Sequence, residues 1–200
     1  MLVLGLTGSL GMGKSTAAAM FARAGVPIFD ADHTVHLLYA EGGAGVAAVE
    51  AAFPGMTVDG AIDRVRLGRR VVGDAEAFAR LEAIVHPLVR NQENVFRERS
   101  AREGRRIALL DMPLFFEIGA DARVDAVAVV TTTYEKQRQR VLSRPGMSEQ
   151  RFEALVARQM PDAEKRARAH FVIDTGGTHD ETEQQIAELL RAVAGMAAGR

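Results

Sequence analysis

A glycine-rich segment, residues 8–15, constrains the fold of this 200-residue chain more than any other feature. Its residues fit the pattern Gly-x-x-x-x-Gly-Lys-Ser/Thr, which builds a phosphate-binding loop where a strand precedes it and a helix follows. The apolar run at residues 2–6 is typical of a strand, and the alanine-rich stretch 16–23, ended by Gly25, is typical of a helix. The chain is therefore predicted to begin with a strand, a phosphate-binding loop (P-loop) and a helix.

The residue types in this loop suit a nucleoside triphosphate. Glycines let successive backbone N–H groups turn toward a phosphate, and the N-terminus of the following helix adds partial positive charge. Lys14 is predicted to reach the β- and γ-phosphates, and the Ser15 hydroxyl is predicted to ligate Mg²⁺. ATP and Mg²⁺ are thus the predicted cofactors. The predicted ATP-binding residues are Gly11, Met12, Gly13, Lys14, Ser15 and Thr16.

A P-loop alone does not distinguish a kinase from a GTPase or a motor ATPase. The sequence contains no Asn-Lys-x-Asp motif for reading guanine, which argues against a GTPase switch. A chain of this size, with a helical insertion and a basic segment near its end, favours a small-molecule kinase. An alternative from another class is a nucleotide-sensing module that binds ATP and changes shape without transferring phosphate.

Composition limits the other classes of function. A hydrophobic content of 48% in 200 residues predicts one main domain. The net charge of -1 argues against a nucleic-acid partner, and the absence of cysteine excludes disulfides, thiolate metal sites and a cysteine nucleophile. The N-terminal apolar run is too short to span a membrane. We therefore expect a cytoplasmic protein with no membrane partner, either a monomer or a small homo-oligomer.

Further apolar runs continue the α/β pattern. Strands are predicted at residues 27–29, 107–110, 125–130 and 171–173, and a mostly helical region, broken at 42–45 and 53–60, is predicted between the second and third strands. Three helix starts carry capping signals: Thr132 with Glu135, Ser148, and Thr178 with Glu181. This order of elements favours a sheet with a helical insertion.

Three carboxylates follow predicted strands. Asp30 and Asp32 would face the same way in an extended backbone, so that one acts on an attacking hydroxyl while the other holds Mg²⁺ water or local structure. Their spacing fits equally well with an N-cap of the next helix. Asp111 stands where a carboxylate binds Mg²⁺ directly or through water, and it could equally be a cap.

An arginine-rich segment follows the fourth predicted strand. Residues 134–170 hold nine Lys or Arg against five acidic residues. Arg138, Arg140 and Arg144 have helical spacing, which indicates a lid whose cations cover a transferring phosphoryl group. A solvated basic helix face is the competing interpretation.

The motifs as a set resemble the dephospho-coenzyme A kinase family over nearly the whole chain. They are Leu-Thr-Gly at 6–8 leading into the P-loop, Asp-Ala-Asp at 30–32, Asp-Gly-Ala-Ile-Asp-Arg at 59–64 with Leu-Gly at 67–68, Leu-Glu-Ala-Ile-Val-His-Pro-Leu-Val at 81–89, Asp-Met-Pro-Leu-Phe-Phe-Glu at 111–117, residues 137–140 and Arg-Gln at 158–159. The resemblance implies an α/β fold, a three-layer P-loop core with a five-stranded parallel sheet. The core would comprise residues 1–32, 107–133 and 171–200, with a helical CoA-binding insertion at 33–106 and a helical lid at 134–170.

The resemblance also implies residue roles and an acceptor, the ribose 3′-hydroxyl of dephospho-coenzyme A. Asp32 would be the general base, Lys14 the phosphate clamp and Arg140 a lid cation. Other residues in family motifs would contact the acceptor: Arg64, His86, Pro113, Glu117 and Arg158. The close alternative is a P-loop kinase of another small acceptor, such as a nucleoside or nucleotide.

Two positions depart from the family pattern. Met12 replaces a small residue such as serine, which costs little if its side chain points outward, because the loop works through its backbone. Thr175 replaces the usual asparagine ahead of Gly177, which leaves the adenine-side contact open.

Overall fold

The computed structural model describes residues 1–198, with side chains described to Gly195, so the last two residues of the predicted core segment 171–200 lie outside the described part. Contacts divide the chain into two compact units. The first comprises Met1–Phe29 and the chain from Ser100 onward, and the second comprises Asp30–Arg99. The predicted insertion, 33–106, contains most of the second unit, and its role in binding a coenzyme stays a prediction.

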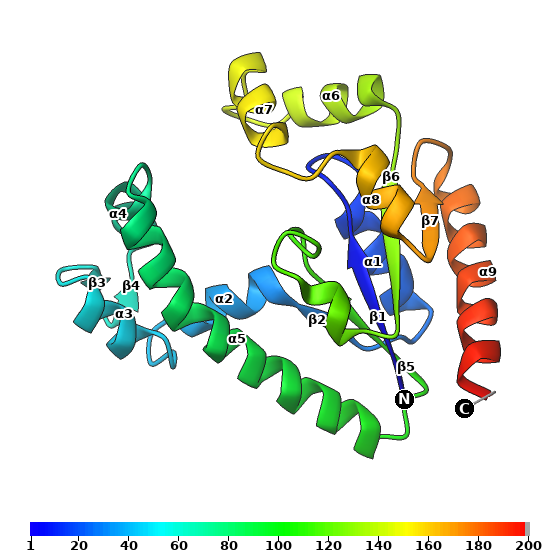
Figure 1. Ribbon diagram of the computed structural model, residues 1–200, viewed down its shortest axis with the longest axis horizontal. Coiled ribbons are helices and arrows are strands. Elements are labelled where there is room, and N and C mark those ends of the chain that lie inside the picture. The colour runs from blue at the N-terminus through cyan, green and yellow to red at the C-terminus, as the bar shows by residue number, and fades with distance from the viewer. Residues whose placement is uncertain (199–200) are drawn as a thin grey trace. The chain divides into compact units, whose positions relative to one another are not determined.

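A five-stranded parallel sheet forms the centre of the first unit, as predicted (Figure 1). Its strands are β1 (Leu2–Thr7), β2 (Ile28–Asp30), β5 (Ile107–Asp111), β6 (Ala126–Thr131) and β7 (Phe171–Asp174). Their order across the sheet is β2-β5-β1-β6-β7. The central strand β1 pairs in parallel with β5 on one side, where Leu6 lies opposite Asp111, and with β6 on the other. The carboxyl ends of these strands therefore meet at one edge of the sheet, where α/β proteins bind ligands.

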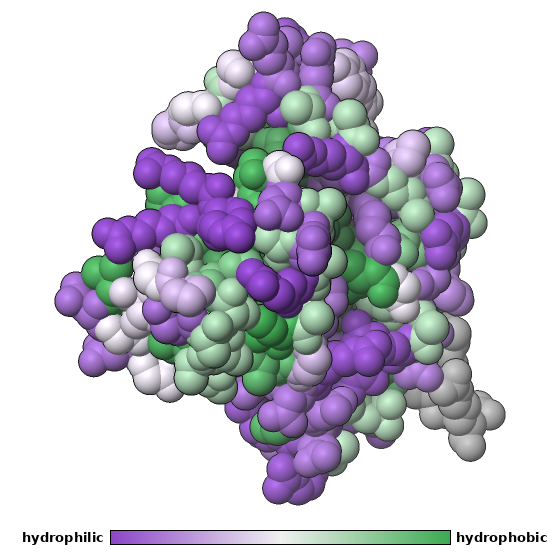
Figure 2. Space-filling view, turned by 60° about the vertical axis from the view of Figure 1, so that its left-hand side comes forward, coloured by the Kyte–Doolittle hydropathy of each residue, from purple (hydrophilic) through white to green (hydrophobic). Residues whose placement is uncertain are grey.

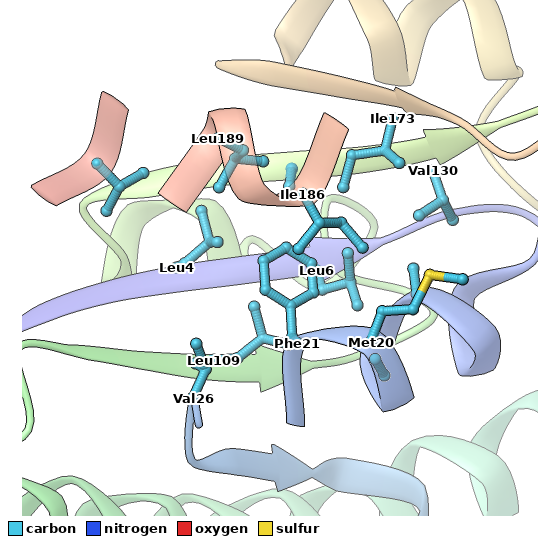
Figure 3. Packing of buried hydrophobic residues seen from close by; sticks show 14 of the residues in the cluster. Leu4, Leu6, Met20, Phe21, Val26, Leu109, Val130, Ile173, Ile186 and Leu189 are labelled. Atoms are coloured by element: carbon cyan, nitrogen blue, oxygen red, sulfur yellow. The ribbon is translucent and has the colours of Figure 1, made fainter. Parts of the chain in front are cut away.

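The two faces of β1 are covered by different elements, as a three-layer core requires. Leu4 and Leu6 pack with residues of α1 (Lys14–Arg23) and α9 (His179–Ala198), including Phe21 and Ile186 (Figure 3). Side chains alternate along a strand, so Gly5 faces the other way. A Cβ at Gly5 would collide with the ring of Phe115, which therefore covers that face. Helices on one face and the segment after β5 on the other hold the strands in place.

The segment 134–170 forms three short helices in the first unit. They are α6 (Tyr134–Leu142), α7 (Glu149–Val156) and α8 (Asp162–Arg168), preceded in the chain by the 3₁₀ turn η1 (Ala120–Arg123). Ser148 caps α7, as predicted, by accepting a hydrogen bond from the Arg151 N–H. The predicted start of α6 is wrong by one residue, because Thr133 rather than Thr132 accepts the capping bond, from the Lys136 N–H.

The helix after β7 begins as the sequence predicts. Thr178 and Glu181 form a reciprocal capping box: the Glu181 N–H donates to Thr178 Oγ1 at 3.2 Å, and the Thr178 N–H donates to Glu181 Oε2 at 2.7 Å. The Thr178 N–H and, second, the Thr178 hydroxyl donate to the Glu181 carboxylate and hold the pKa of that carboxyl below its usual range. The box fixes where α9 starts and hence how it lies on the sheet.

The second unit is mostly helical, but it contains a hairpin that the sequence pattern did not predict. Its elements are α2 (Ala31–Tyr39), α3 (Val46–Ala52), β3 (Thr57–Val58), β4 (Ala61–Ile62), α4 (Arg64–Val71) and α5 (Ala75–Arg102), whose last residues belong to the first unit. The turn of the hairpin is Asp59-Gly60, and both residues have positive φ. Asp-Gly is a strong signal for such a turn, but each flanking strand has only two residues, too few to show an alternating pattern.

Glu50 fixes the entry to this hairpin. Its carboxylate accepts hydrogen bonds from the Gly55 N–H at 2.6 Å and from the N–H and hydroxyl of Thr57, both at 2.7 Å. These bonds, with the Thr57 hydroxyl contributing most, lower the pKa of the exposed Glu50 carboxyl. The hairpin is therefore held to α3 by polar contacts as well as by Ile62 in the core of the unit.

The visible face is a mixture of hydrophilic residues and smaller hydrophobic patches (Figure 2). Scattered exposed apolar residues of this kind are usual in globular proteins. Within residues 1–198, no helix is both long enough and apolar enough to cross a membrane.

Candidate active site

The phosphate loop joins β1 to α1 at the carboxyl edge of the sheet. Gly11 and Gly13 have φ values of 79° and 88°, a region that side chains other than glycine's rarely adopt. The first i to i−4 bond of α1 runs from the Ala17 N–H to the Gly13 carbonyl, at 3.0 Å. The N–H groups of residues 14–16 precede that bond, so the helix itself leaves them without acceptors. This helix end has the donors and the dipole that bind a phosphate.

Neighbouring residues leave no space for a side chain at either of these glycines. A Cβ at Gly11 would lie 2.5 Å from Val141 Cγ2 of α6, and one at Gly13 would lie 2.8 Å from Thr175 Oγ1. The two positions therefore need glycine for space as well as for backbone conformation. Because these contacts come from α6 and from the residue after β7, both elements help to shape the loop.

Lys14 and Asp111 form an ion pair at the mouth of the loop. Lys14 Nζ lies 2.6 Å from Asp111 Oδ1, and the two side chains are only 17% and 6% exposed. Asp111 is the last residue of β5, in register with Leu6 of β1. The sheet thus brings a carboxylate directly to the lysine of the loop. Its proposed part in binding Mg²⁺ stays a prediction.

The Met12 side chain does not point outward. An outward direction was the condition under which a large residue at this position was expected to cost little. The Met12 side chain is 3% exposed and belongs to the core between the sheet, α1 and α9. The larger residue is therefore accommodated as part of the hydrophobic core. The Met12 N–H is also engaged, since it donates to the Ser9 carbonyl at 3.1 Å and closes a turn inside the loop.

Two glutamines of the 134–170 segment hold Leu10, at the tip of the loop. The Leu10 N–H donates to Gln159 Oε1 at 2.9 Å, and Gln137 Nε2 donates to the Leu10 carbonyl at 2.8 Å. Sequence reasoning gave neither glutamine a role. A signal existed for Gln137: it shares the inward face of α6 with Val141, four residues on, and a buried polar side chain needs a partner.

The three arginines of the predicted lid have different surroundings. The Arg140 guanidinium, half-buried, donates to Thr175 Oγ1 at 3.0 Å and to the Thr175 carbonyl at 2.7 Å. Thr175 Oγ1 in turn lies 2.8 Å from the Met12 carbonyl, so Arg140 is linked to the loop through one residue. Arg138 instead pairs with Glu149 of α7 and thereby lowers the pKa of that carboxyl, while Arg144 is exposed. Of the three, Arg140 lies closest to the phosphate loop in the bonding network.

Glu117, which was predicted to contact the phosphoryl acceptor, connects the segment after β5 to the linker between α7 and α8. Glu117 Oε1 accepts a hydrogen bond from the Met160 N–H at 2.9 Å and lies 2.9 Å from Lys165 Nζ. Burial would raise the pKa of Glu117, but the Met160 N–H and the Lys165 ammonium outweigh it, so the pKa is lowered. Lys165 is fully buried, and within the described residues its ammonium makes this ion pair but no hydrogen bond of good geometry.

Pro113 and Arg158 are the other two residues of this unit that were predicted to contact the phosphoryl acceptor. The Pro113 carbonyl accepts a hydrogen bond from Thr7 Oγ1 at 3.1 Å, which ties the segment after β5 to the end of β1. Arg158 is exposed, directly before Gln159. Their contacts with an acceptor stay predictions.

In the second unit, the two aspartates at 30 and 32 have separate surroundings. Asp30 is the N-cap of α2 and accepts a hydrogen bond from the His33 N–H at 2.9 Å. Asp32 is exposed in the first turn of that helix. Of the two interpretations of this motif, the helix N-cap is therefore confirmed, and the one in which both carboxylates project from an extended strand is wrong. Since Asp30 caps the helix, Asp32 is the better candidate for acting on a substrate.

Arg64 and His86, which were also predicted to contact the phosphoryl acceptor, lie on different helices of the second unit. Arg64 Nη1 is 3.2 Å from His36 Nδ1 of α2. Burial raises the pKa of the nearby Tyr39 hydroxyl, and the charge of Arg64 partly opposes that rise. His86 is on α5, exposed, with Nε2 3.8 Å from Glu82 Oε1. Arg64 thus presents a cation beside α2, the helix that carries Asp32.

A phosphate loop with paired lysine and aspartate, at the carboxyl edge of a parallel sheet and beside an arginine-bearing helical segment, defines a P-loop kinase. The dephospho-CoA kinase family model matches residues 2–181, and the chain belongs to that family. Curated dephospho-CoA kinases from Brucella melitensis and Rhodopseudomonas palustris are 51% and 54% identical to it, each over 98% of this chain and 96% and 98% of their own lengths. The crystal structure of TT1252 from Thermus thermophilus is 32% identical over 96% of both chains, with a TM-score of 0.83.

Proposed function

We propose that the protein transfers the γ-phosphoryl group of ATP to the ribose 3′-hydroxyl of dephospho-CoA, giving CoA and ADP, the last step of CoA synthesis. The observation that carries the proposal is the Lys14–Asp111 pair beside the phosphate loop, in a chain whose family match extends over residues 2–181. The loop supplies the phosphate site, and family membership supplies the acceptor.

At the nucleotide end, the N–H groups of Gly11, Gly13 and Lys14 would cradle the phosphates, and Lys14 would move from Asp111 to the β- and γ-oxygens. Ser15 and Asp111 offer a hydroxyl and a carboxylate, the hard oxygen donors that Mg²⁺ prefers in combination with substrate phosphates, so these residues fit the metal. When bound, Mg²⁺ would neutralise charge on the phosphates. Thr16, exposed in the first turn of α1, completes the proposed ATP-binding set.

At the acceptor end, Asp32 would accept the proton of the 3′-hydroxyl as its oxygen attacks the γ-phosphorus. Its exposure in the first turn of α2, a helix that Asp30 already caps, supports this role. Arg64 and His86 of the same unit, with Pro113, Glu117 and Arg158 of the first unit, are the proposed acceptor contacts. Arg140 would stabilise charge on the transferring group, and its guanidinium already lies against Thr175.

A panel of acceptors tests the function. ADP release by the purified protein is measured with dephospho-CoA, adenosine, AMP and shikimate, each at several concentrations with Mg·ATP. We expect dephospho-CoA alone to raise the rate strongly. ADP release that is equally fast or faster with a nucleoside or a nucleotide would mean that this molecule, rather than dephospho-CoA, is the acceptor. ATP binding without acceptor-dependent ADP release would mean that the protein senses a nucleotide and is not a kinase.

A further inference from the structure

Leu10 is held through both of its backbone polar groups by side chains that lie far away in the sequence. Gln159, between α7 and α8, accepts from its N–H at 2.9 Å, and Gln137, in α6, donates to its carbonyl at 2.8 Å. Gln137 is 3% exposed. The orientation of each carboxamide is fixed by chemistry, because an N–H can only donate and a carbonyl can only accept.

These bonds determine where neighbouring groups of the loop point. A trans peptide is planar, with its C=O and N–H directed oppositely, so a bond that fixes one of the two groups also fixes the other. The Leu10 carbonyl directed at Gln137 therefore turns the Gly11 N–H away from α6. The Leu10 N–H directed at Gln159 turns the Ser9 carbonyl the opposite way, where it accepts from the Met12 N–H at 3.1 Å.

A third peptide plane of the loop is held in the same manner. Thr175 Oγ1 lies at hydrogen-bond distance, 2.8 Å, from the Met12 carbonyl, so the Gly13 N–H points away from Thr175. Gly11 and Gly13 are the two loop positions with positive φ, where the backbone of glycine is permissive. Side chains from outside the loop thus hold the peptide planes on either side of Leu10 and the plane between Met12 and Gly13.

We propose that Gln137 and Gln159 are positioning residues for nucleotide binding: their carboxamides hold the Leu10 peptide groups so that the Gly11 amide is aimed at a phosphate before ATP arrives. An amide already aimed loses less conformational freedom when the phosphate binds. The inference rests on the proposed function in that ATP is the nucleotide. It also makes the 134–170 segment a structural part of the phosphate site.

The opposite hydrogen-bonding roles of the two glutamines provide the test. Glutamate keeps an acceptor for the Leu10 N–H at position 159, but at position 137 it loses the donor and sets a carboxylate against a carbonyl. Gln137→Glu and Gln159→Glu add the same charge to the same segment. Gln139→Glu, at an exposed position of α6, is the matched control for that charge. Gln137→Met and Gln159→Met remove the bonds without adding charge.

The measurements are the Kd for Mg·ATP by calorimetry without acceptor, the KM for each substrate, and thermal unfolding. We expect Gln137→Glu to weaken ATP binding roughly tenfold more than Gln159→Glu, and each Met variant to weaken it roughly five- to tenfold, with the KM for dephospho-CoA little changed. Equal loss in the two Glu variants, or Met variants that lower the unfolding temperature and leave ATP affinity unchanged, would overturn the proposal. If Gln137→Glu does not fold, the Met variants decide.

ATP binding in this design is independent of the acceptor. A wild-type protein that ignores dephospho-CoA would remove the proposed acceptor and leave the comparison of ATP affinities valid. Failure of the glutamine variants to affect ATP binding, with normal dephospho-CoA turnover in the wild type, would remove only the positioning role.

Discussion

Lys14 Nζ lies 2.6 Å from Asp111 Oδ1, so the lysine of the phosphate loop has a counterion on the neighbouring strand. The pairing follows from the parallel register of β1 with β5, which sets Asp111 opposite Leu6. In the proposed mechanism, a nucleotide would draw the Lys14 ammonium to its phosphates, and the Asp111 carboxylate would then act on Mg²⁺. One arrangement of two strands thus prepares both the cation for the phosphates and the proposed carboxylate for Mg²⁺.

Asp111→Asn removes the charge from this carboxylate with little change in shape. We expect kcat to fall on the order of a hundredfold and the Mg²⁺ concentration for half-maximal rate to rise, because an amide is a weaker metal ligand and a weaker counterion. Steady-state rates over a Mg²⁺ titration measure both effects. Asp180→Asn, at an exposed position in the first turn of α9, is the control for loss of one negative charge. An unchanged Mg²⁺ dependence would limit Asp111 to pairing with Lys14.

Asp32→Asn tests the proposed general base. We expect ATP binding to persist and turnover of dephospho-CoA to fall by roughly 10²- to 10⁴-fold, the usual contribution of a positioned base. Asp30→Asn is the matched control, because asparagine caps a helix about as well as aspartate and α2 should be retained. Full activity of the Asp32 variant in the ADP-release assay would leave the base unassigned.

Arg140→Lys keeps a positive charge but loses the planar fork that donates to both oxygens of Thr175. We expect kcat to fall by roughly tenfold or more while the Kd for ATP changes less, since the charge on the transferring group develops only in the transition state. Arg144→Lys, at an exposed position of the same segment, is the comparison. Parallel losses of ATP affinity and kcat would mean that Arg140 binds the ground state.

The Glu117–Lys165 pair should contribute to stability in a pH-dependent way. Glu117→Gln leaves a fully buried ammonium without its counterion, which we expect to cost about 3 kcal/mol near neutral pH. The folded-state pKa of Glu117 is lowered, so its contribution is present above the usual glutamate pKa of about 4.3 and is lost as pH falls through the lowered value. Denaturant unfolding at pH 7 and in mild acid measures the cost of the substitution and its dependence on pH.

The difference in unfolding free energy between wild type and Glu117→Gln should therefore become smaller in acid. A control is the double variant Glu117→Gln with Lys165→Met, which removes the buried charge and should recover part of the lost stability. A gap that stays constant from pH 7 down through the titration of Glu117, or a double variant less stable than Glu117→Gln, would contradict the account.

Local sequence signals predicted the elements that depend on neighbouring residues. The strand, loop and helix of residues 2–23, the Ser148 cap and the Thr178–Glu181 box all involve partners within a few residues, and the structure has them. The cap of α6 is displaced by one residue because Thr132 and Thr133 are both good caps and only the backbone path after β6 decides between them.

Contacts between distant residues could not be predicted in this way. Gln137 and Gln159 contact Leu10 across 127 and 149 residues, and no local pattern encodes such a pairing. Met12 is buried because α1 and the sheet leave room for it, a property of the packed core. The two-residue strands β3 and β4 are too short for periodicity, so only the Asp59-Gly60 turn marked their place.

The most direct test of the central claim is the position of the transferred phosphate. Dephospho-CoA is converted with Mg·ATP, and the product is analysed by ³¹P NMR and mass spectrometry. We predict one new phosphomonoester per ADP formed, on the ribose 3′-oxygen, with the coenzyme otherwise intact. Release of ADP and inorganic phosphate with dephospho-CoA unchanged, or phosphorylation at another oxygen, would contradict the account.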